Sequence, residues 1–269
     1  MRNEPGLPAL LDRAPVSDGR SETFAPVGER RAYAAPGESL TFAVLTRAGR
    51  ELIVTLTTQP VFDLALSAPV ARRIRRTVRH RGGESALTSL ARRTLEPGDL
   101  ESIDLQTLGK GRDLLRLGAH DSGVLPAFWR TVAAGGGYAP ACVELQNQIA
   151  PAALLVEIMG GIEHAPPEAV RSAMAQFGSR SAALILHIAP DPAAAWRLAP
   201  VRAQCLLIDF AGVEHEHARD WGAAAQLIGA ARQACPQVML LNLRPDRGLA
   251  AQAAGATHAV FAGMQAVTI

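Results

Sequence analysis

Short, almost wholly apolar runs alternate with amphipathic stretches through the second half of the chain. A continuous apolar run is typical of a strand that is buried on both faces, as in a parallel sheet covered by helices. Such runs occur at residues 153–158, 182–188, 205–210 and 238–243, and a shorter one at 258–261. Repeated strand–helix units favour a right-handed, wound parallel sheet. We therefore expect an α/β fold that closes as a TIM-like barrel.

The first half has a different pattern, which predicts a β-hairpin near the N-terminus. Two β-rich runs, 40–45 and 52–56, flank a turn that contains Gly49. The stretch 70–81 is the most basic in the chain, and we interpret it as a helix, or a strand-to-helix passage, with a solvated charged face. A contact with a phosphate or a partner is the alternative.

The remaining elements of the first half are a short run at 102–105 that leads into an amphipathic helix at 108–117, a strand at 123–129 and a helix at 141–149. Residues 1–37 are rich in Pro, Gly, Arg and Ser and have no sustained periodicity, which predicts a flexible N-terminal leader. No stretch of the sequence indicates a boundary to a second domain, so a single barrel domain is expected over residues 38–269.

Composition narrows the function classes. With 48% apolar and 19% charged residues among 269, the chain is expected to fold. A formal net charge of +2 gives no support for a nucleic-acid partner. No apolar stretch approaches the roughly 20 residues that span a bilayer, so we expect a cytoplasmic protein without a membrane span. The three widely spaced cysteines, Cys142, Cys205 and Cys235, are expected to be buried free thiols.

The order and spacing of the strands resemble the EAL domain, a barrel family whose best-known members hydrolyse cyclic di-GMP. Residues 59–64, Gln-Pro-Val-Phe-Asp-Leu, are similar to the family's first strand. Residues 155–158 resemble the strand that carries a metal-binding glutamate, here Glu157. Residues 207–209 lie where the family has Lys-Ile-Asp, and 255–258 resemble the closing turn. The resemblance implies a barrel of the EAL type and a place in bacterial cyclic di-GMP-related signalling.

The departures from the family pattern bear on activity. Catalysis in the family needs two divalent cations held by several carboxylates and an asparagine. The signature glutamate position falls at Arg73, the second glutamate of the metal strand falls at Gly160, and the lysine is replaced by Leu207. The asparagine strand aligns with 124–127, which has no amide, and the late glutamate falls on residue 241 or 242. Glu157 and Asp209 alone remain, and two isolated carboxylates are too few for a paired-metal site.

Our leading hypothesis is a catalytically inactive, degenerate EAL-like domain. This pseudo-enzyme would act as a regulatory or protein-interaction module without a cofactor, with a protein partner. A homodimer is a further alternative. A second hypothesis is a non-hydrolysing cyclic di-GMP receptor whose ligand-binding residues are Gln59, Arg73, Arg75 and Arg76, because arginines pair well with phosphates.

A third hypothesis is a metal-dependent phosphodiesterase or other barrel hydrolase. Its metal ligands would be Glu157, Asp209, His215 and His217, with Mg²⁺ or Mn²⁺ as cofactor. A His-Glu-His loop after a buried strand could chelate a metal if a further ligand came from elsewhere. The competing interpretation is a polar loop that precedes a helix. A lone histidine at the end of an apolar run, His187, is interpreted as a satisfied core residue.

Overall fold

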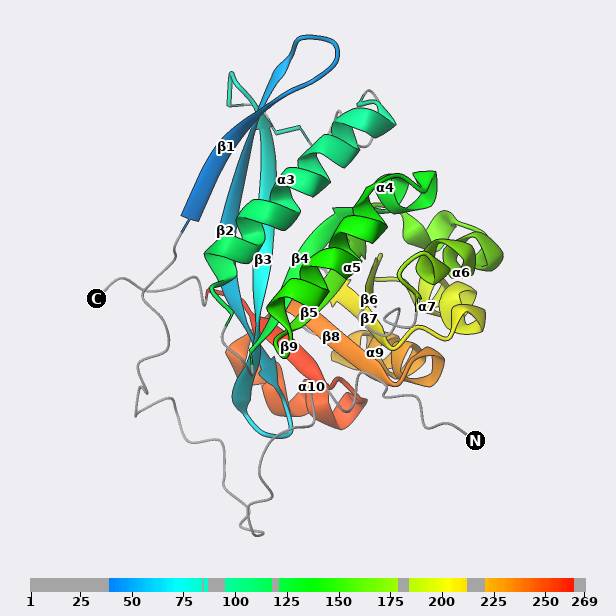
Figure 1. Cartoon of the computed structure of the whole chain (residues 1–269). Helices are drawn as coiled ribbons and strands as arrows, with labels where there is room; N and C mark the ends of the chain where they lie inside the picture. The colour runs from blue at the N-terminus through cyan, green and yellow to red at the C-terminus, as the bar shows by residue number, and fades with distance from the viewer. Residues whose placement is uncertain are drawn as a thin grey trace, which may run out of the picture.

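The strands of the computed structural model form a closed barrel with one extra strand outside it (Figure 1). The structure describes residues 39–83, 85–86, 95–117, 121–178, 184–211 and 221–263. Eight of the described strands, β2 to β9, form the ring, which closes through pairing of β2 with β9. The strands are β1 (Ser39–Leu45), β2 (Glu51–Asp63), β3 (Ala68–His80), β4 (Ser122–Phe128), β5 (Ala153–Met159), β6 (Leu184–Ile188), β7 (Cys205–Asp209), β8 (Gln237–Leu243) and β9 (His258–Phe261).

All neighbouring pairs from β3 to β9 are parallel, whereas β2 is antiparallel to both of its ring neighbours. The expected hairpin is confirmed, because β1 pairs antiparallel with β2 without a break in register. Its turn contains Gly49 at φ +73°, a left-handed conformation that glycine adopts without steric cost. The expected α/β barrel is therefore confirmed, with one antiparallel member.

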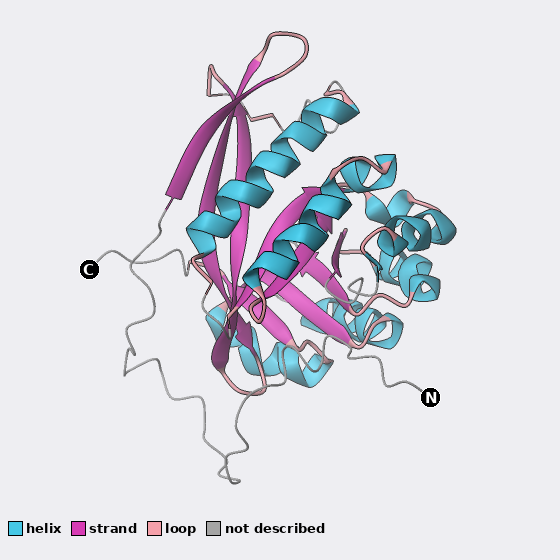
Figure 2. Ribbon diagram, in the orientation of Figure 1, coloured by secondary structure: helices cyan, strands magenta, loops and turns pink. Residues whose placement is uncertain are grey.

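Strands β2 and β3 have 13 residues each, whereas the other barrel strands have 4 to 7. The additional length of β2 and β3 extends beyond the barrel. β3 pairs with β4 only at Arg72 and Arg73, whereas it pairs with β2 along its whole length. On one face of this extension the apolar side chains are buried beneath helix α3 (Pro97–Leu115). The opposite face carries threonines and exposed arginines. Together with β1, the extension forms an antiparallel sheet that is covered by a helix on one side (Figure 2).

The structure corrects two expectations in the first half. The basic stretch 70–81 is not a helix; it lies almost wholly in strand β3. Its buried residues Ile74 and Val78 are spaced four apart, which mimics a helical face, but β2 supplies backbone partners that local pattern does not reveal. Helix α3 also begins earlier than expected, at Pro97, where Glu96 and Asp99 form a capping box.

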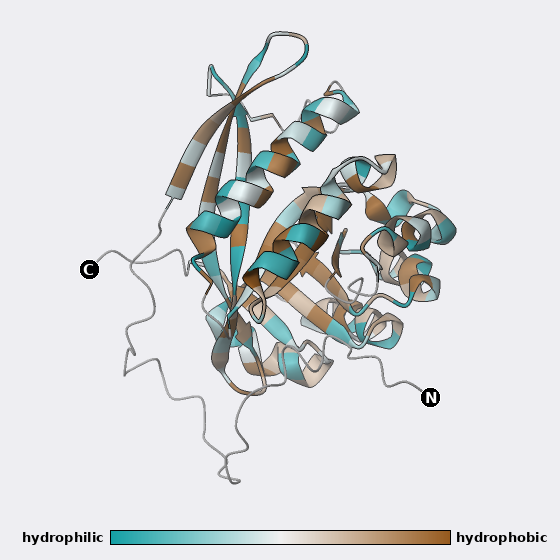
Figure 3. Cartoon of the chain, viewed as in Figure 1, coloured by the Kyte–Doolittle hydropathy of each residue, from teal (hydrophilic) through white to brown (hydrophobic). Residues whose placement is uncertain are grey.

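The remaining helices surround the barrel and bury its outer surface. They are α4 (Trp129–Ala134), α5 (Tyr138–Ile149), α6 (Pro167–Ala175), α7 (Pro192–Leu198), α9 (Trp221–Ala234) and α10 (Gly248–Ala254), with 3₁₀ turns η1 (Ile162–His164), η3 (Ala199–Val201) and η4 (Pro245–Arg247). Figure 3 shows apolar residues concentrated on the strands. The barrel interior holds its own apolar cluster: Val61, Ala71, Val124, Leu155, Ile185, Cys205, Leu207, Met239, Leu241 and Val260.

The cysteines are free and buried, as expected. Burial raises the pKa of Cys142 to about 12 and that of Cys235 to about 11, so neither thiol ionises at neutral pH. None of the helices in the described ranges has the length and apolar character that crossing a bilayer requires. The expected leader, residues 1–37, lies outside the described residues and stays a prediction.

Candidate functional site

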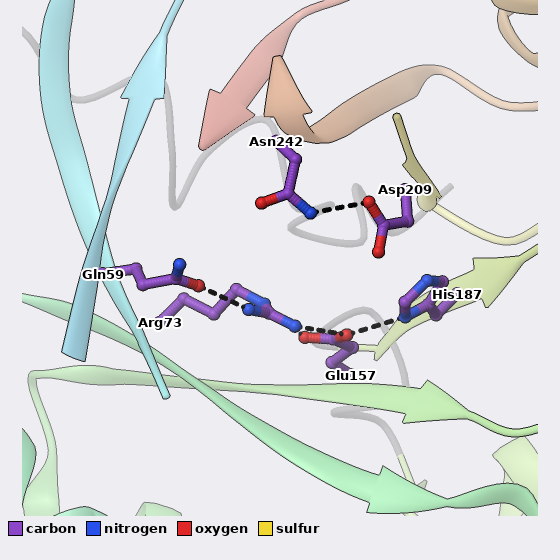
Figure 4. A network of polar contacts seen from close by, with 6 residues as sticks. All are labelled: Gln59, Arg73, Glu157, His187, Asp209 and Asn242. Atoms are coloured by element: carbon purple, nitrogen blue, oxygen red, sulfur yellow. Dashed lines mark hydrogen bonds and ion pairs between the residues drawn. The ribbon is translucent and has the colours of Figure 1, made fainter. Parts of the chain in front are cut away.

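Polar side chains from six of the eight barrel strands lie inside the barrel, toward the C-terminal ends of the parallel strands (Figure 4). Side chains alternate between the two faces of a strand, so every second residue points into the barrel. Further toward the N-terminal ends of the parallel strands, the inward positions belong to the apolar interior cluster. The group comprises Gln59, Arg73, Glu157, His187, Asp209 and Asn242. This end of a barrel is where active sites are built.

An ion pair between Arg73 and Glu157 is the centre of the group. Arg73 Nε lies 2.6 Å from Glu157 Oε2 and Arg73 Nη2 lies 2.8 Å from Oε1, which is a bidentate arrangement. The third guanidinium nitrogen, Nη1, donates to Gln59 Oε1 at 2.7 Å. The two charged side chains are 7% and 0% exposed. The guanidinium is therefore held in one orientation by two neighbours, away from solvent.

His187 completes the surroundings of Glu157, with its Nδ1 2.9 Å from Oε1. Burial alone would raise the pKa of the Glu157 carboxyl, but Arg73 and His187 outweigh burial and lower it from 4.5 to about 2. Glu157 is therefore ionised at neutral pH. The sequence predicted that His187 would be a core residue with a hydrogen-bond partner. It has one, and that partner is Glu157, the glutamate at the centre of the polar group.

The depressed pKa of Glu157 predicts a dependence of stability on acid. An acid whose pKa is lower in the folded state stabilises the fold above its unfolded pKa, and this contribution disappears as the pH falls through the folded value. We expect the free energy of unfolding of the wild-type protein to decrease between pH 4.5 and about 2 more steeply than that of Glu157→Gln. Urea unfolding at a series of acidic pH values measures both slopes, and parallel curves would contradict the assignment.

A second, smaller contact joins Asp209 and Asn242. Asn242 Nδ2 donates to Asp209 Oδ1 at 2.7 Å, and the backbone N–H of Ala211 donates to the same oxygen at 2.9 Å. Asn242 is in the left-handed region, at φ +55°, where the pairing of β8 with β9 shifts register between Leu241 and Leu243. This bulge brings Asn242 toward Asp209, while Leu241 remains in the apolar interior.

The three arginines expected to bind a ligand have different surroundings. Arg73 is inside the barrel. Arg75 lies two residues further along β3 on the same face, beyond the pairing with β4; it is exposed and forms no ion pair with a described residue. Arg76 lies on the outer face, where Nη1 is 2.6 Å from Asp104 Oδ1 and the guanidinium lies over the Phe128 ring at 4.1 Å. The structure thus brings Gln59, Arg73 and Glu157 together but places Arg76 elsewhere.

The described residues at the C-terminal end of the barrel, which we call the mouth, do not suit a pair of divalent cations. Each cation needs several oxygen ligands, and both oxygens of Glu157 already contact Arg73 or His187. Within the described ranges there is no group of three or more His, Cys, Asp or Glu residues that could hold a metal ion. The predicted ligands His215 and His217 lie outside the described residues. A cation at Glu157 would have to displace the guanidinium of Arg73.

Comparison with known proteins gives matches by structure alone. No family model matches the sequence, and no curated protein does. An EAL domain protein from Listeria monocytogenes superposes with a TM-score of 0.55 at 9% identity, covering 77% of this chain and 85% of that one. The PaMucR phosphodiesterase, solved as a c-di-GMP complex, superposes with a TM-score of 0.54 at 14% identity, covering 77% and 89%.

A third match is BlrP1 of Klebsiella pneumoniae, solved as a manganese and cyclic di-GMP complex. Its TM-score is 0.54 at 14% identity, covering 84% of this chain. This chain spans 58% of the length of BlrP1, so the match concerns one part of that protein. At these identities the likeness concerns architecture. Together with the closed ring and its single antiparallel strand, it shows that this chain has the fold of the EAL domain.

Proposed function

We propose that this chain is a catalytically inactive EAL-like domain that acts as a regulatory or protein-interaction module in cyclic di-GMP-related signalling. The observation that carries the proposal is the bidentate ion pair between Arg73 and Glu157. By the resemblance, Glu157 is the glutamate of a metal-binding strand and Arg73 stands where a further carboxylate ligand would be. In this chain the two residues neutralise each other.

Electrostatics supports the loss of metal chemistry. A guanidinium carries a permanent positive charge, so it repels a divalent cation from the same carboxylate. Removing one partner of a buried ion pair typically costs about 3–5 kcal/mol, which a metal would have to offset before it could bind. The remaining carboxylate at the described mouth, Asp209, already accepts two hydrogen bonds through Oδ1. Activation of a water by two metals therefore has no support here.

A second candidate is a receptor that binds cyclic di-GMP without hydrolysing it. Arg75 favours this function because it is exposed and lies two residues beyond Arg73 on the same face of β3. Arginine forms charge-assisted, bidentate hydrogen bonds with phosphate. Two of the structural neighbours were solved in complex with this nucleotide. The third hypothesis, a metal-dependent hydrolase, depends on the loop of His215 and His217, and no contact of the described residues supports it.

The proposal predicts that the protein does not hydrolyse cyclic di-GMP in the presence of Mg²⁺ or Mn²⁺. Turnover can be followed by chromatography of the nucleotide, beside titration calorimetry with the nucleotide in the absence of metal. We expect no linear or mononucleotide product. Hydrolysis that exceeds a blank and disappears in Glu157→Gln would overturn the proposal.

The calorimetry separates the two candidates. If the chain is a receptor, metal-independent heat is expected in the wild-type protein and is lost in Arg75→Ala. Arg79→Ala is the matched control, because Arg79 is also exposed on this face of β3 but lies four residues further along the strand. Absence of binding in the wild-type protein eliminates the receptor function and leaves the interaction module.

A further inference from the structure

Strand β1 lies at the edge of the sheet that the described strands form. It pairs with β2 on one side, and no described strand pairs with its other side (Figure 1). Its sequence, Ser-Leu-Thr-Phe-Ala-Val-Leu, contains no charged residue and no proline, and its register with β2 is continuous over all 7 residues. Proteins usually protect an edge with a lysine, a proline, a bulge or a covering element. β1 has none of the first three, so its edge is suited to pairing with another strand.

The ladder to β2 fixes which backbone groups of β1 face outward. Thr46, just beyond the strand, donates its N–H to Arg50 O at 2.8 Å and so forms a hydrogen-bonded pair. Hydrogen-bonded and non-hydrogen-bonded pairs alternate along an antiparallel ladder. Even-numbered residues of β1 therefore bond to β2, whereas odd-numbered residues such as Thr41 and Ala43 direct their N–H and C=O groups outward.

The side chains of β1 also alternate, with even-numbered residues on one face of the sheet and odd-numbered residues on the other. The even-numbered residues Leu40, Phe42 and Val44 are apolar and join the core beneath α3. Val44 is buried, whereas Leu40 and Phe42 are only half-buried. The odd-numbered positions lie on the opposite, exposed face. A strand added at this edge would therefore cover the half-buried pair if its own apolar side chains lay on the α3 side.

We propose that the edge of β1 pairs antiparallel with β1 of a second copy of this chain, with Phe42 opposite Phe42 of that copy. In this register Thr41 lies opposite Ala43, so two outward-facing residues exchange hydrogen bonds. Leu40 lies opposite Val44, so apolar side chains meet on one face. The two-fold axis is perpendicular to the sheet and places both α3 helices on the same side. The interface is isologous, as in most homodimers.

The match between β1 and itself is the reason for choosing a second copy as the partner. Centring the pairing on Phe42 uses the full length of the strand. In this register the outward backbone groups of odd-numbered residues bond to each other, and the apolar side chains of even-numbered residues meet on one face. β1 itself also carries no charged side chain that would face its own copy. The proposal is independent of whether the barrel mouth binds a nucleotide.

Ala43→Pro tests the proposal. Proline removes the outward N–H of residue 43, and its ring obstructs pairing, but it leaves the bonds to β2 intact because those come from even-numbered residues. Sedimentation equilibrium of the full chain should show a wild-type dimer that dissociates on dilution and a monomeric Ala43→Pro variant. Ala43→Ser is the matched control and should remain dimeric. Circular dichroism should show an unchanged fold in both variants.

Cysteine cross-linking tests the register. In a non-hydrogen-bonded pair the Cα atoms are about 4.5 Å apart, within the range of a disulfide. Phe42→Cys should therefore give a disulfide-linked dimer on mild oxidation, whereas Leu40→Cys, which faces residue 44, should not. The native cysteines are buried and do not compete. A monomeric wild-type protein, a dimer that survives Ala43→Pro, or equal cross-linking at residues 40 and 42 would overturn the proposal.

Discussion

Replacing Arg73 with alanine is expected to destabilise the protein by about 3–5 kcal/mol, among the largest effects of any single substitution. The variant leaves the Glu157 carboxylate fully buried without its guanidinium partner and leaves Gln59 without its hydrogen-bond donor. Burial then dominates, and we expect the pKa of Glu157 to rise. Urea unfolding at neutral pH measures the loss of free energy.

Two variants control for other causes. Arg75→Ala removes a charge two residues away, but at an exposed position, so it should change the free energy of unfolding by about 0.5 kcal/mol or less. The double variant Arg73→Met with Glu157→Met removes both buried charges and should recover most of the lost stability. If the double variant is as unstable as Arg73→Ala, the ion pair does not explain the effect.

Asp104→Ala is expected to have the second large effect, also about 3–5 kcal/mol. Asp104 is fully buried in α3, accepts from Arg76 Nη1 at 2.6 Å and accepts from the backbone N–H of Phe128 at 3.0 Å. Alanine leaves a buried guanidinium uncompensated and the amide without its acceptor. This contact joins the upper part of β3 to α3 and to the end of β4, so thermal and urea unfolding should both report the loss.

Asp104→Asn is the matched variant for this position. Burial raises the pKa of Asp104 and opposes the effect of Arg76, so the ionised carboxyl carries a desolvation penalty. Asparagine keeps an acceptor for the amide of Phe128 and removes that penalty, and we expect it to lose less stability than alanine. Equal losses in the two variants would show that the amide contact contributes little.

Much of the fold could be predicted because its strands are locally distinct. The apolar runs at 153–158, 205–210 and 238–243 became β5, β7 and β8 with only small changes at their ends. Strand β3 could not be predicted in this way, because arginines occupy both faces of the strand and hide the alternation of apolar and polar residues. Its strand conformation depends on pairing with β2, which the sequence of β3 alone does not reveal. Tertiary context overrides local pattern most readily in such polar strands.

The candidate site was only partly predictable. The resemblance placed a cation, Arg73, where a metal ligand was expected, but its pairing with Glu157 joins residues that are 84 positions apart. Sequence alone does not reveal such a contact until both strands are known to face the same interior. The contact of Asn242 with Asp209 was harder to predict, because it depends on a β-bulge and a left-handed backbone conformation. No glycine at this position indicates that conformation in the sequence.

The ion pair with Arg73 compensates the charge of the fully buried Glu157 carboxylate. A carboxylate is costly to bury unless a partner of opposite charge compensates it. In this chain the partner comes from β3, which β4 separates from β5 in the barrel, and is itself positioned by Gln59 of β2. Glu157, Arg73 and Gln59 therefore satisfy one another. On the function proposed above, this polar group is a structural centre rather than a cation site.

A crystal structure grown in the presence of Mn²⁺, with data collected at the manganese absorption edge, is the most direct test of this central claim. We predict that Arg73 remains in bidentate contact with Glu157 and that the anomalous map shows no manganese at the barrel mouth. Manganese coordinated by Glu157 and Asp209, with the guanidinium of Arg73 displaced, would contradict the account.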